Sequence, residues 1–585
     1  MKLRFTRFSI IFACTLIISN HVFSQVDLVA SGGTTMMSYT TVKDAFDAIN
    51  AGTHTGTITL NISGNTTEPA TGAVLNASGS GSSNYTSITI KPTGGAARII
   101  SGAANAGSPL INLNGADNVT IDGLNTGGNS LTIENTTVSS TSGTSTLKFE
   151  SDATNNLITK CSINGASTMP TGTNGGNIYF GASAITTGSD NNTISFCKIG
   201  PSGANLPTKG IYGNGTGTST THYNSNITIT DCEIYDFFNA TAQSNGIYMT
   251  SANTDWNILN NKFYQTATRT QTTAASNIAI QLASANINNC LISGNVIGYS
   301  NASGTGVYTL SSTVATLFIG ISVSVGTVTP TSVQGNTISS ISNTTSSGAS
   351  TGSGILCGIA AVAGNINIGN ITGNTIGVAS GTASLIATPS TSTGAIVGIN
   401  SASTDNIIIQ NNTIGGFQCI GSTSTIASAV HGINVSGAAT SITITGNTIG
   451  NATANNMVAG TLGTSTGATI AIGINATSVP VTANYSNNTI QNFASNGSGT
   501  GNCRGIFTST TTNVTSVHTI NNNIINNLST NSSLTGATSG LTAAAGIHYF
   551  PGLNSTISNN TISNISGLNT GLVNTVITGI ACANA

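Results

Sequence analysis

A short motif, asparagine followed two residues later by isoleucine, returns at regular intervals along most of the chain. One copy lies in the stretch SITITGNTIG, residues 441–450, where polar and apolar residues alternate just before the motif. This alternation is typical of a strand with one buried face, and a long fixed repeat is typical of stacked supersecondary units. The motif asparagines are Asn295, Asn336, Asn374, Asn412, Asn447, Asn488, Asn522 and Asn560, with Asn261 before Phe263 as a near match.

Two further landmarks belong to the same repeating unit. Cysteine holds the asparagine position in KCSI, FCKI and DCEI, at Cys161, Cys197 and Cys232, and successive units are 29 to 41 residues apart. A glycine-isoleucine pair precedes most of the asparagines by 14 to 17 residues. Since this spacing is nearly constant, insertions are confined to the part of each unit between an asparagine and the next glycine-isoleucine pair. These glycines are Gly246, Gly320, Gly358, Gly398, Gly432, Gly473, Gly505 and Gly546.

A coil of three short parallel strands explains both the alternation and the spacing. In such a coil Ile442 and Ile444 point inward, Asn447 lies at the bend, and Ile449 begins the next inward face. Asparagine suits the bend because it tolerates left-handed geometry and carries both a donor and an acceptor for backbone groups that leave the ladder. Successive asparagines would stack at the strand spacing of ~4.8 Å. The motif therefore predicts an all-β solenoid in which the asparagines are architectural.

The asparagine row resembles that of the right-handed parallel β-helix proteins of the pectate-lyase-like superfamily. The chain is more closely similar to exported surface proteins of Bacteroidota that are built from such repeats. The resemblance covers roughly residues 40–585 and implies a helix that closes the N-terminal end of the solenoid. The segment TTVKDAFDAINAG fits this cap, since Val42, Ala45, Phe46 and Ile49 have helical spacing.

The first residues predict export. Lys2, Arg4 and Arg7 precede an apolar run, and small residues follow it, as in a secretory signal peptide cleaved near Ser24. No later stretch approaches the ~20 apolar residues that a membrane-spanning helix needs. We therefore expect a secreted or cell-surface protein. The expected divisions are a signal peptide at 1–24, a cap helix with the first irregular coils at 25–145, and β-helix repeats at 146–585, interrupted at the C-terminus.

The composition excludes two classes of partner. Only 5% of the residues are charged, against about 25% in an average protein, and the net charge is −2. A chain of this kind lacks the basic surface that nucleic acids or anionic membranes require. Disorder is also excluded, because isoleucine and valine recur regularly and disordered tracts are poor in such residues.

The positions of the charges limit where catalysis could occur. From Gln271 to the end, the charged side chains are Asp405 and Arg504 alone. They are three rungs apart, roughly 14 Å at the usual strand spacing. A general acid and a general base cannot meet in this part of the chain, so any hydrolytic or eliminative site must precede residue 270.

One alternative places such a site in the charged region. Asp231, Asp236 and Asp255 would be its carboxylates and Arg269 its base. The resemblance to pectate lyases implies that calcium, which prefers carboxylate oxygens, would be the cofactor of this site. Without this alternative, no cofactor or metal is expected.

The same region has a structural interpretation. Lys198, Glu233 and Lys262 each follow the ladder position by one residue, so opposite charges would stack on an outward face. The nearby aromatic side chains would then fill the core and cover its flank instead of stacking on sugar rings. These residues are Tyr235, Phe237, Phe238, Tyr248, Trp256, Phe263 and Tyr264.

The interpretation favoured by these patterns is an exported, non-enzymatic β-helix that serves as a stalk or adhesin segment at the cell surface. Its partners would be polysaccharides or other cell-surface components. The alternative is a polysaccharide lyase or glycoside hydrolase that acts on anionic polysaccharide. A third class, an ice- or carbohydrate-binding surface, is suggested by an outward row of threonines. The row consists of Thr337, Thr375, Thr413, Thr448, Thr489 and Thr561.

Two expectations concern the cysteines and the C-terminus. Cysteines stacked on neighbouring strands fall within the Cα separation of about 4.4–6.8 Å that a disulfide needs. Cysteine is also a good small residue for a core. We expect free thiols at Cys161, Cys197 and Cys232. The last glycine-isoleucine pair begins at Gly579 and has only five residues after it. We therefore expect the native polypeptide to continue beyond Ala585.

Overall fold

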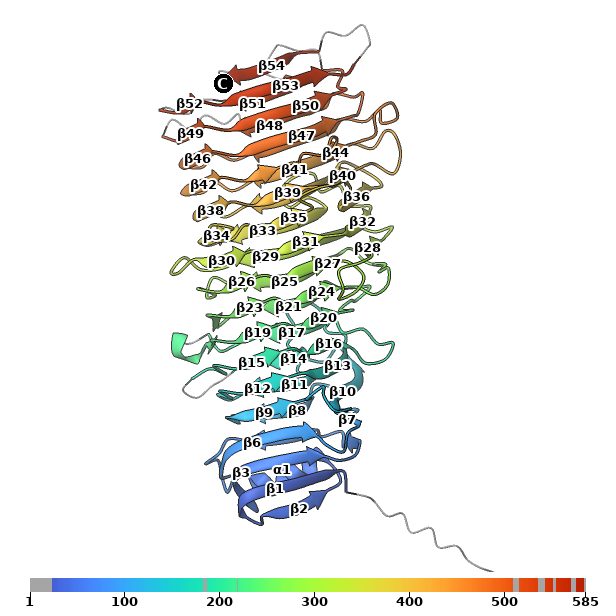
Figure 1. Ribbon diagram of the computed structural model, residues 1–585, viewed down its shortest axis with the longest axis vertical. Coiled ribbons are helices and arrows are strands. Elements are labelled where there is room, and N and C mark those ends of the chain that lie inside the picture. The colour runs from blue at the N-terminus through green and yellow to red at the C-terminus, as the bar shows by residue number, and fades with distance from the viewer. Residues whose placement is uncertain are drawn as a thin grey trace, which may run out of the picture.

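The computed structural model describes residues 24–182, 187–217, 219–508, 515–534, 542–550, 554–569 and 575–582. In these residues the chain is a tall stack of parallel coils, a parallel β-helix, with one α-helix near the N-terminal end (Figure 1). Of the expected signal peptide, only Ser24 belongs to the described residues. The expected continuation beyond Ala585 also lies outside them. Among the described residues, no helix is long and apolar enough to cross a membrane.

The N-terminal cap is built as the sequence predicts, with an addition. Helix α1 (Val42–Asn50) begins at Thr41, whose side chain accepts a hydrogen bond from the backbone N–H of Asp44. Its buried residues are Val42, Ala45, Phe46 and Ile49, the four that the helical spacing indicates. The addition is a pair of strands, β1 (Val26–Gly33) and β2 (Met36–Tyr39), which pair antiparallel with each other, while β1 also pairs antiparallel with β3 (His54–Ile62).

Sheet A contains the strand that leads into the asparagine corner of each coil. From β3 onward its strands pair in parallel, with apolar residues in register, for example Ile409 beside Ile444. Its further strands are β6 (Tyr85–Pro92), β9 (Val119–Asp122), β12 (Leu157–Thr159), β15 (Thr193–Ser195), β19 (Thr228–Thr230), β23 (Asn257–Leu259), β26 (Leu291–Ser293), β30 (Thr331–Gln334), β34 (Ile366–Ile368), β38 (Asn406–Gln410), β42 (Ser441–Thr445), β46 (Thr482–Ser486), β49 (Val517–Asn521) and β52 (Thr556–Ser558).

Sheet B follows the asparagine corner. Its main row contains β4 (Thr66–Glu68), β7 (Ala97–Gly102), β10 (Ser130–Ser139), β13 (Cys161–Ser167), β16 (Lys198–Pro201), β20 (Glu233–Tyr235), β24 (Lys262–Tyr264), β27 (Val296–Gly298), β31 (Thr337–Ser339), β35 (Thr375–Gly377), β39 (Thr413–Gly415), β43 (Thr448–Ile449), β47 (Thr489–Ser495), β50 (Ile524–Thr530) and β53 (Thr561–Gly567). A second row joins it at β47 and contains β28 (Tyr308–Ser311), β32 (Ile341–Thr345), β36 (Leu385–Pro389), β40 (Phe417–Cys419) and β44 (Met457–Ala459).

Sheet C completes each coil. Its strands are β5 (Ala73–Asn76), β8 (Pro109–Asn114), β11 (Ser145–Glu150), β14 (Gly176–Phe180), β17 (Lys209–Gly213), β21 (Ser244–Met249), β25 (Ala275–Ala283), β29 (Thr316–Ser324), β33 (Leu356–Ala363), β37 (Gly394–Ser401), β41 (Ser428–Val435), β45 (Thr469–Ala476), β48 (Asn502–Thr508), β51 (Ala544–Tyr549) and β54 (Ile577–Cys582). A small parallel pair, β18 (Asn224–Ser225) and β22 (Asn253–Thr254), and a 3₁₀ turn, η1 (Thr220–His222), lie outside the three sheets. Because β5 already pairs with β8, and β3 with β6, the solenoid includes strands from residue 54 onward.

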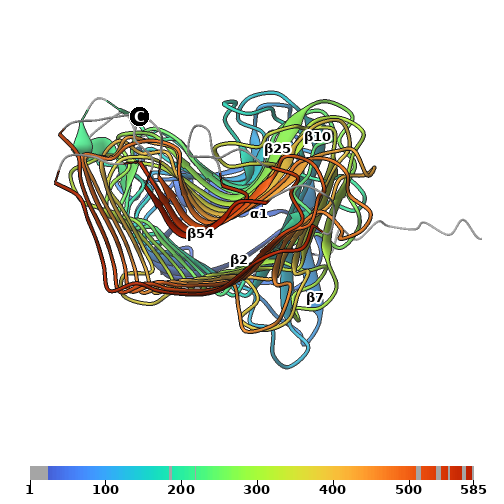
Figure 2. The same cartoon turned by 90° about the horizontal axis from the view of Figure 1, so that it is seen from above.

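The strands of sheet C curve toward the interior (Figure 2), and each contains a landmark glycine over much of the stack. Seen along the axis, the coils lie over one another and the strands of sheet C curve inward (Figure 2). In the pairing of β29 with β33, Ile319 lies opposite Cys357 and Ile321 lies opposite Ile359, with Gly320 between the two isoleucines. The glycine is needed there because a Cβ on Gly320 would lie 2.7 Å from the carbonyl oxygen of Gly358. The glycine-isoleucine landmark therefore marks the middle of a sheet C strand.

Candidate functional site

The asparagine ladder uses nearly all its polar atoms within the stack. Asn447 donates from Nδ2 to Oδ1 of Asn488 at 3.0 Å and to the backbone oxygen of Ile409 at 2.9 Å. Its Oδ1 accepts from the backbone N–H and from Nδ2 of Asn412, at 2.9 and 3.0 Å. The members are Asn261, Asn295, Asn336, Asn374, Asn412, Asn447, Asn488, Asn523 and Asn560. Because these amides are paired, and all but the half-buried Asn560 are buried, the ladder is an architectural feature and not a binding site.

The sequence assignment of one ladder member was wrong. Two motifs overlap in residues 522–525, and the structure places Asn523, not Asn522, in the stack, where its Oδ1 accepts from the backbone N–H of Asn488 at 3.0 Å. Asn522 lies one residue earlier with a left-handed φ of 54°. Which asparagine joins the ladder is decided by which isoleucine enters the core. Ile525 is fully buried against Gly505, whereas Ile524 is 49% exposed. A shift of one residue would reverse these two faces of the strand.

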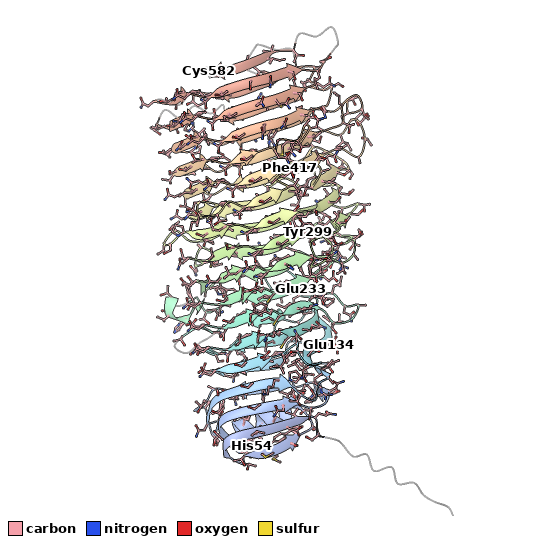
Figure 3. The ribbon with its side chains drawn as sticks, in the orientation of Figure 1. His54, Glu134, Glu233, Tyr299, Phe417 and Cys582 are labelled. Atoms are coloured by element: carbon pink, nitrogen blue, oxygen red, sulfur yellow. The ribbon has the colours of Figure 1, made fainter. Side chains whose placement is uncertain are left out.

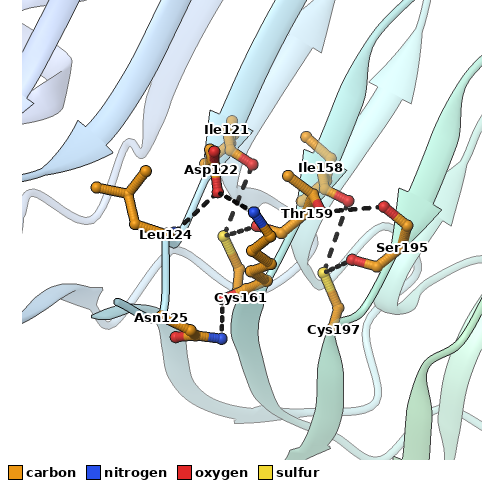
Figure 4. Close-up of polar contacts among 10 residues, drawn as sticks. Ile121, Asp122, Leu124, Asn125, Ile158, Thr159, Cys161, Ser195 and Cys197 are labelled. Atoms are coloured by element: carbon orange, nitrogen blue, oxygen red, sulfur yellow. Dashed lines mark hydrogen bonds and ion pairs between the residues drawn. The ribbon is translucent and has the colours of Figure 1, made fainter. Parts of the chain in front are cut away.

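Three cysteines continue the ladder toward the N-terminus. The backbone N–H of Cys232 donates to Oδ1 of Asn261 at 2.9 Å, the same bond that each asparagine makes with the next. Cys161, Cys197 and Cys232 are buried free thiols. Sγ of Cys161 is 3.2 Å from the carbonyl oxygen of Thr159. Figure 4 shows that Sγ of Cys161 and Sγ of Cys197 both point toward neighbouring carbonyl oxygens. Burial raises the pKa of the Cys161 and Cys232 thiols, which keeps them protonated.

The carboxylates proposed for a carbohydrate site lie at different corners of the coils. Asp231 follows β19, Asp236 follows β20, and Asp255 precedes β23. All three have left-handed φ angles between 53° and 58°, a geometry that aspartate and asparagine tolerate better than most residues. Asp231 accepts a hydrogen bond from the hydroxyl of Thr230, and Asp255 accepts one from Nδ2 of Asn289. The backbone of the corners therefore explains why these positions carry acidic side chains.

Of the four candidates, the structure brings together Asp236 and Arg269. They form an ion pair in which the two side chains are 9% and 12% exposed. Asp236 also accepts from the backbone N–H and the hydroxyl of Thr266, at 2.8 and 2.7 Å. Nε of Arg269 donates to Oε1 of Gln265 at 2.6 Å. The pair joins two neighbouring coils, and both oxygens of Asp236 as well as Nε and Nη2 of Arg269 are engaged by protein atoms.

The stacked charges form as expected. Glu233 pairs in register with Lys198 on one side and Lys262 on the other, and Nζ of Lys198 is 3.9 Å from Oε2 of Glu233. Glu233 lies on sheet B about midway along the solenoid (Figure 3). Its Oε2 also accepts from the hydroxyl of Tyr264, whose ring stacks on Tyr235 at 5.3 Å. Since the Lys198 side chain is 59% exposed, this ion pair adds little stability.

The threonine row continues the same column of sheet B. Its members from Thr337 to Thr489 pair in register strand by strand. Ile524 then takes the next position and Thr561 the one after it. The row is thus a single column that a large apolar side chain interrupts, whereas an ice-binding surface would be expected to present several equal columns.

Most of the aromatic side chains in the charged region fill the core. Trp256 and Phe263 are fully buried, and Nε1 of Trp256 donates to the backbone oxygen of Asn224 at 3.1 Å. Phe237 is 1% exposed, and Phe238, Tyr248 and Tyr264 are also buried. Tyr235 is half-buried beside Tyr264. This arrangement agrees with the structural interpretation of the aromatic set.

A cluster on the outer face of sheet C was not anticipated. Lys209 is fully buried, and its ammonium donates to the backbone oxygens of Pro170 and Thr173 at 3.0 and 2.6 Å. The ammonium lies 4.6 Å from the ring centre of Tyr212, whose ring is tilted against those of Tyr179 and Tyr248 on either side. Burial lowers the pKa of Lys209 to about 8. The signal that could have revealed this cluster is the sequence KGIY, a cation and an aromatic residue on either side of the glycine-isoleucine landmark.

The histidines and the carboxylate of the C-terminal half of the chain lie apart from one another in the fold. His431 and His548 lie in sheet C strands, and His518 lies in sheet A. Asp405 accepts from the backbone N–H of Gly364 at 3.1 Å. Within the part of the chain that the structure describes, no group of three or more His, Cys, Asp or Glu side chains is placed to hold a metal ion.

Comparisons with known proteins add little to this description. No protein-family model matches the chain, and no curated protein matches it. Two solved structures of PfbA, a surface adhesin of Streptococcus pneumoniae, are similar, with 12% and 14% identical residues. The matches cover 68% and 69% of this chain and 86% and 91% of the PfbA chains, each with a TM-score of 0.31. Since this score is low, the fold assignment rests on the strand pairings described above.

Proposed function

We propose that the chain is an exported, non-enzymatic β-helix that acts as a stalk or adhesin segment at the cell surface, of the type found in Bacteroidota. The observation that carries this proposal is the separation of the charged groups. Asp231, Asp236 and Asp255 occupy different corners, and Arg269 is engaged by Asp236. A general acid–base reaction needs such groups within hydrogen-bond reach of one substrate, and their separation favours a structural role.

The regular stack supports the stalk. The 15 strands of sheet C at ~4.8 Å per rung give a rod about 70 Å long. Hydrogen bonds run along its axis both in the sheets and in the asparagine ladder. A rod of this kind would hold a binding surface away from the cell, and polysaccharides or other cell-surface components would be its partners.

Incubation with anionic polysaccharides tests the non-enzymatic part of the proposal. The purified protein is mixed with a panel of these polymers in the presence of calcium, and ultraviolet absorbance of unsaturated products and the number of reducing ends are followed. No product is expected. Release of either product by the wild-type protein, and not by an Asp236→Asn variant, would instead establish the lyase or hydrolase.

Protease treatment of intact cells tests the location. Cleavage of the chain on intact cells, while a cytoplasmic protein in the same cells stays whole, is the expected outcome. Protection of the chain until the cells are lysed would contradict a surface position.

A further inference from the structure

Arg504 is a buried cation on the outer face of β48 in sheet C. Its side chain is 4% exposed and lies over the ring of Phe507, with the guanidinium carbon 4.7 Å from the ring centre. Neither Nε nor Nη2 of Arg504 has a hydrogen-bond partner in the structure of the described residues. Burying such donors without partners is costly, so this arrangement calls for an explanation.

The chain itself offers Arg504 no carboxylate side chain. No aspartate or glutamate follows Asp405 in the whole sequence. Asp405 follows β37, which is three strands before β48 in sheet C, or roughly 14 Å away. Its carboxylate is also engaged by the backbone N–H of Gly364. No side chain of this sequence near Arg504 can therefore serve as its counter-ion.

Lys209 shows what a completed site of this kind looks like. The sequences KGIY at 209–212 and RGIF at 504–507 place a cation, the landmark glycine and an aromatic residue at the same positions of their strands. Register pairing connects the two cations through one column of sheet C. Both cations lie over the aromatic ring three residues later. The ammonium of Lys209, however, donates to two backbone oxygens, whereas Nε and Nη2 of Arg504 donate to none in the part of the chain that the structure describes.

The groups around Arg504 are suited to an anion. The next strand places His548 beside Phe507, with ring centres 5.6 Å apart. Both ring nitrogens of His548 are buried and have no partner among the described residues. Its imidazole is neutral at pH 7, because burial and the nearby Arg504 lower its pKa to about 4, and it therefore carries one N–H donor. Asn502, two residues before Arg504, has an unpaired amide oxygen, and turning its amide would present Nδ2.

We propose that Arg504 is the anchor of a binding site for a carboxylate on the outer face of sheet C. The two unpaired atoms, Nε and Nη2, lie on the same edge of the guanidinium. Two parallel donors on one edge match the two oxygens of a carboxylate. The N–H of His548 supplies a third donor. Asn502 and Phe507 are partly exposed on either side, so the guanidinium lies just below the surface. This inference does not depend on the proposed stalk function.

Acetate is the probe for this site. The full chain is titrated with sodium acetate in a calorimeter and heated in acetate or chloride at equal ionic strength. We expect saturable binding and a melting temperature several degrees higher in acetate. Arg504→Lys keeps the charge but loses the paired donors, and should bind acetate at least tenfold more weakly. Lys209→Gln is the matched control, and should retain the wild-type affinity if it folds.

The wild-type titration alone can overturn the proposal. Equal melting temperatures in acetate and chloride, together with no heat of binding, would show that the site does not exist. Stabilisation by sulfate or phosphate but not by acetate would refute the assignment to a carboxylate. Wild-type affinity in Arg504→Lys would place acetate elsewhere on the protein. If the two variants fold poorly, the wild-type protein alone can be tested by the line width of the ¹³C-acetate signal. Broadening that excess unlabelled acetate reverses, and chloride does not, still supports binding.

Discussion

Gly358 on sheet C lies directly against Ile376 on sheet B across the core of the solenoid. A Cβ placed on Gly358 would stand 2.5 Å from Cγ2 of Ile376 and 2.6 Å from the carbonyl oxygen of Gly398. Gly398 has the same relation to Ile414 one coil later. The two sequence landmarks are therefore the two sides of one contact, repeated in coil after coil. This contact explains why each landmark glycine is followed by its asparagine motif at a nearly constant distance.

The first prediction concerns this glycine column. Gly358→Ala should lower the free energy of unfolding by about 1–3 kcal/mol, because a methyl group has no room between Ile376 and the next strand. Gly579→Ala is the matched control. Gly579 belongs to the same column, but a Cβ there would meet no atom within 4 Å. Urea denaturation measures both variants, and equal effects would mean that the contact with the isoleucine does not require glycine.

The second prediction tests the register at residues 522 and 523. Asn523→Ala should lower the free energy of unfolding by about 2–5 kcal/mol, since it leaves buried partner atoms on Asn488 and Tyr485, and a half-buried one on Asn560, without a hydrogen bond. Asn522→Gly should change it by less than about 1 kcal/mol, because glycine readily adopts the left-handed φ of this position. A larger loss for Asn522→Gly than for Asn523→Ala would restore the original assignment of the ladder. Chemical denaturation of the two variants gives the comparison.

Much of the fold was predictable because the coil imposes the same local demands many times. Ile442 and Ile444 are buried and Asn447 occupies the bend, as the alternation indicates. The cap helix was predictable for the same reason, since its buried face has a strict spacing. Strands β1 and β2 were not predicted, because they are not part of the repeat. They also pair antiparallel, whereas the other sheet pairings of the described residues are parallel.

The candidate site was less predictable, because it depends on which side chains meet between coils. Sequence separation says little about such contacts, as Asp236 and Arg269 are 33 residues apart and yet paired. The candidates Asp231 and Asp255 were chosen for their charge, but their left-handed backbone accounts for them. Arg504 was read as an isolated charge, and its burial could not be inferred without the register of sheet C.

The third prediction concerns the thiols. In the native protein, Cys582 should react rapidly with iodoacetamide because it is exposed, while the ladder cysteines should react only after denaturation. Burial and the raised pKa of Cys161 and Cys232 both suppress the reactive thiolate. Alkylation without a reductant, followed by mass spectrometry, gives the answer. A peptide pair that joins Cys161 to Cys197, or Cys197 to Cys232, through a disulfide would contradict the stack of free thiols.

The fourth prediction is a loss of stability on acidification that depends on His431. Its side chain is 4% exposed between Val397 and Ile472 of the adjacent strands, and burial lowers its pKa from 6.5 to about 4. Between these two values the unfolded chain binds a proton that the folded chain does not, so the stability due to neutral His431 is complete above pH 6.5 and is lost toward pH 4. The full shift corresponds to a loss on the order of 3 kcal/mol.

Comparison with a variant isolates this imidazole. Burial also lowers the pKa of His518 and His548, whereas it raises the pKa of Glu68 and Asp190, whose effect on stability has the opposite sign. These groups are present in both proteins, so they cancel in the difference between the wild type and His431→Leu. The free energy of unfolding, measured by urea denaturation from pH 7 to pH 4.5, should fall more steeply for the wild type. Parallel curves for the two proteins would show that His431 takes up its proton as readily in the folded chain as in the unfolded one.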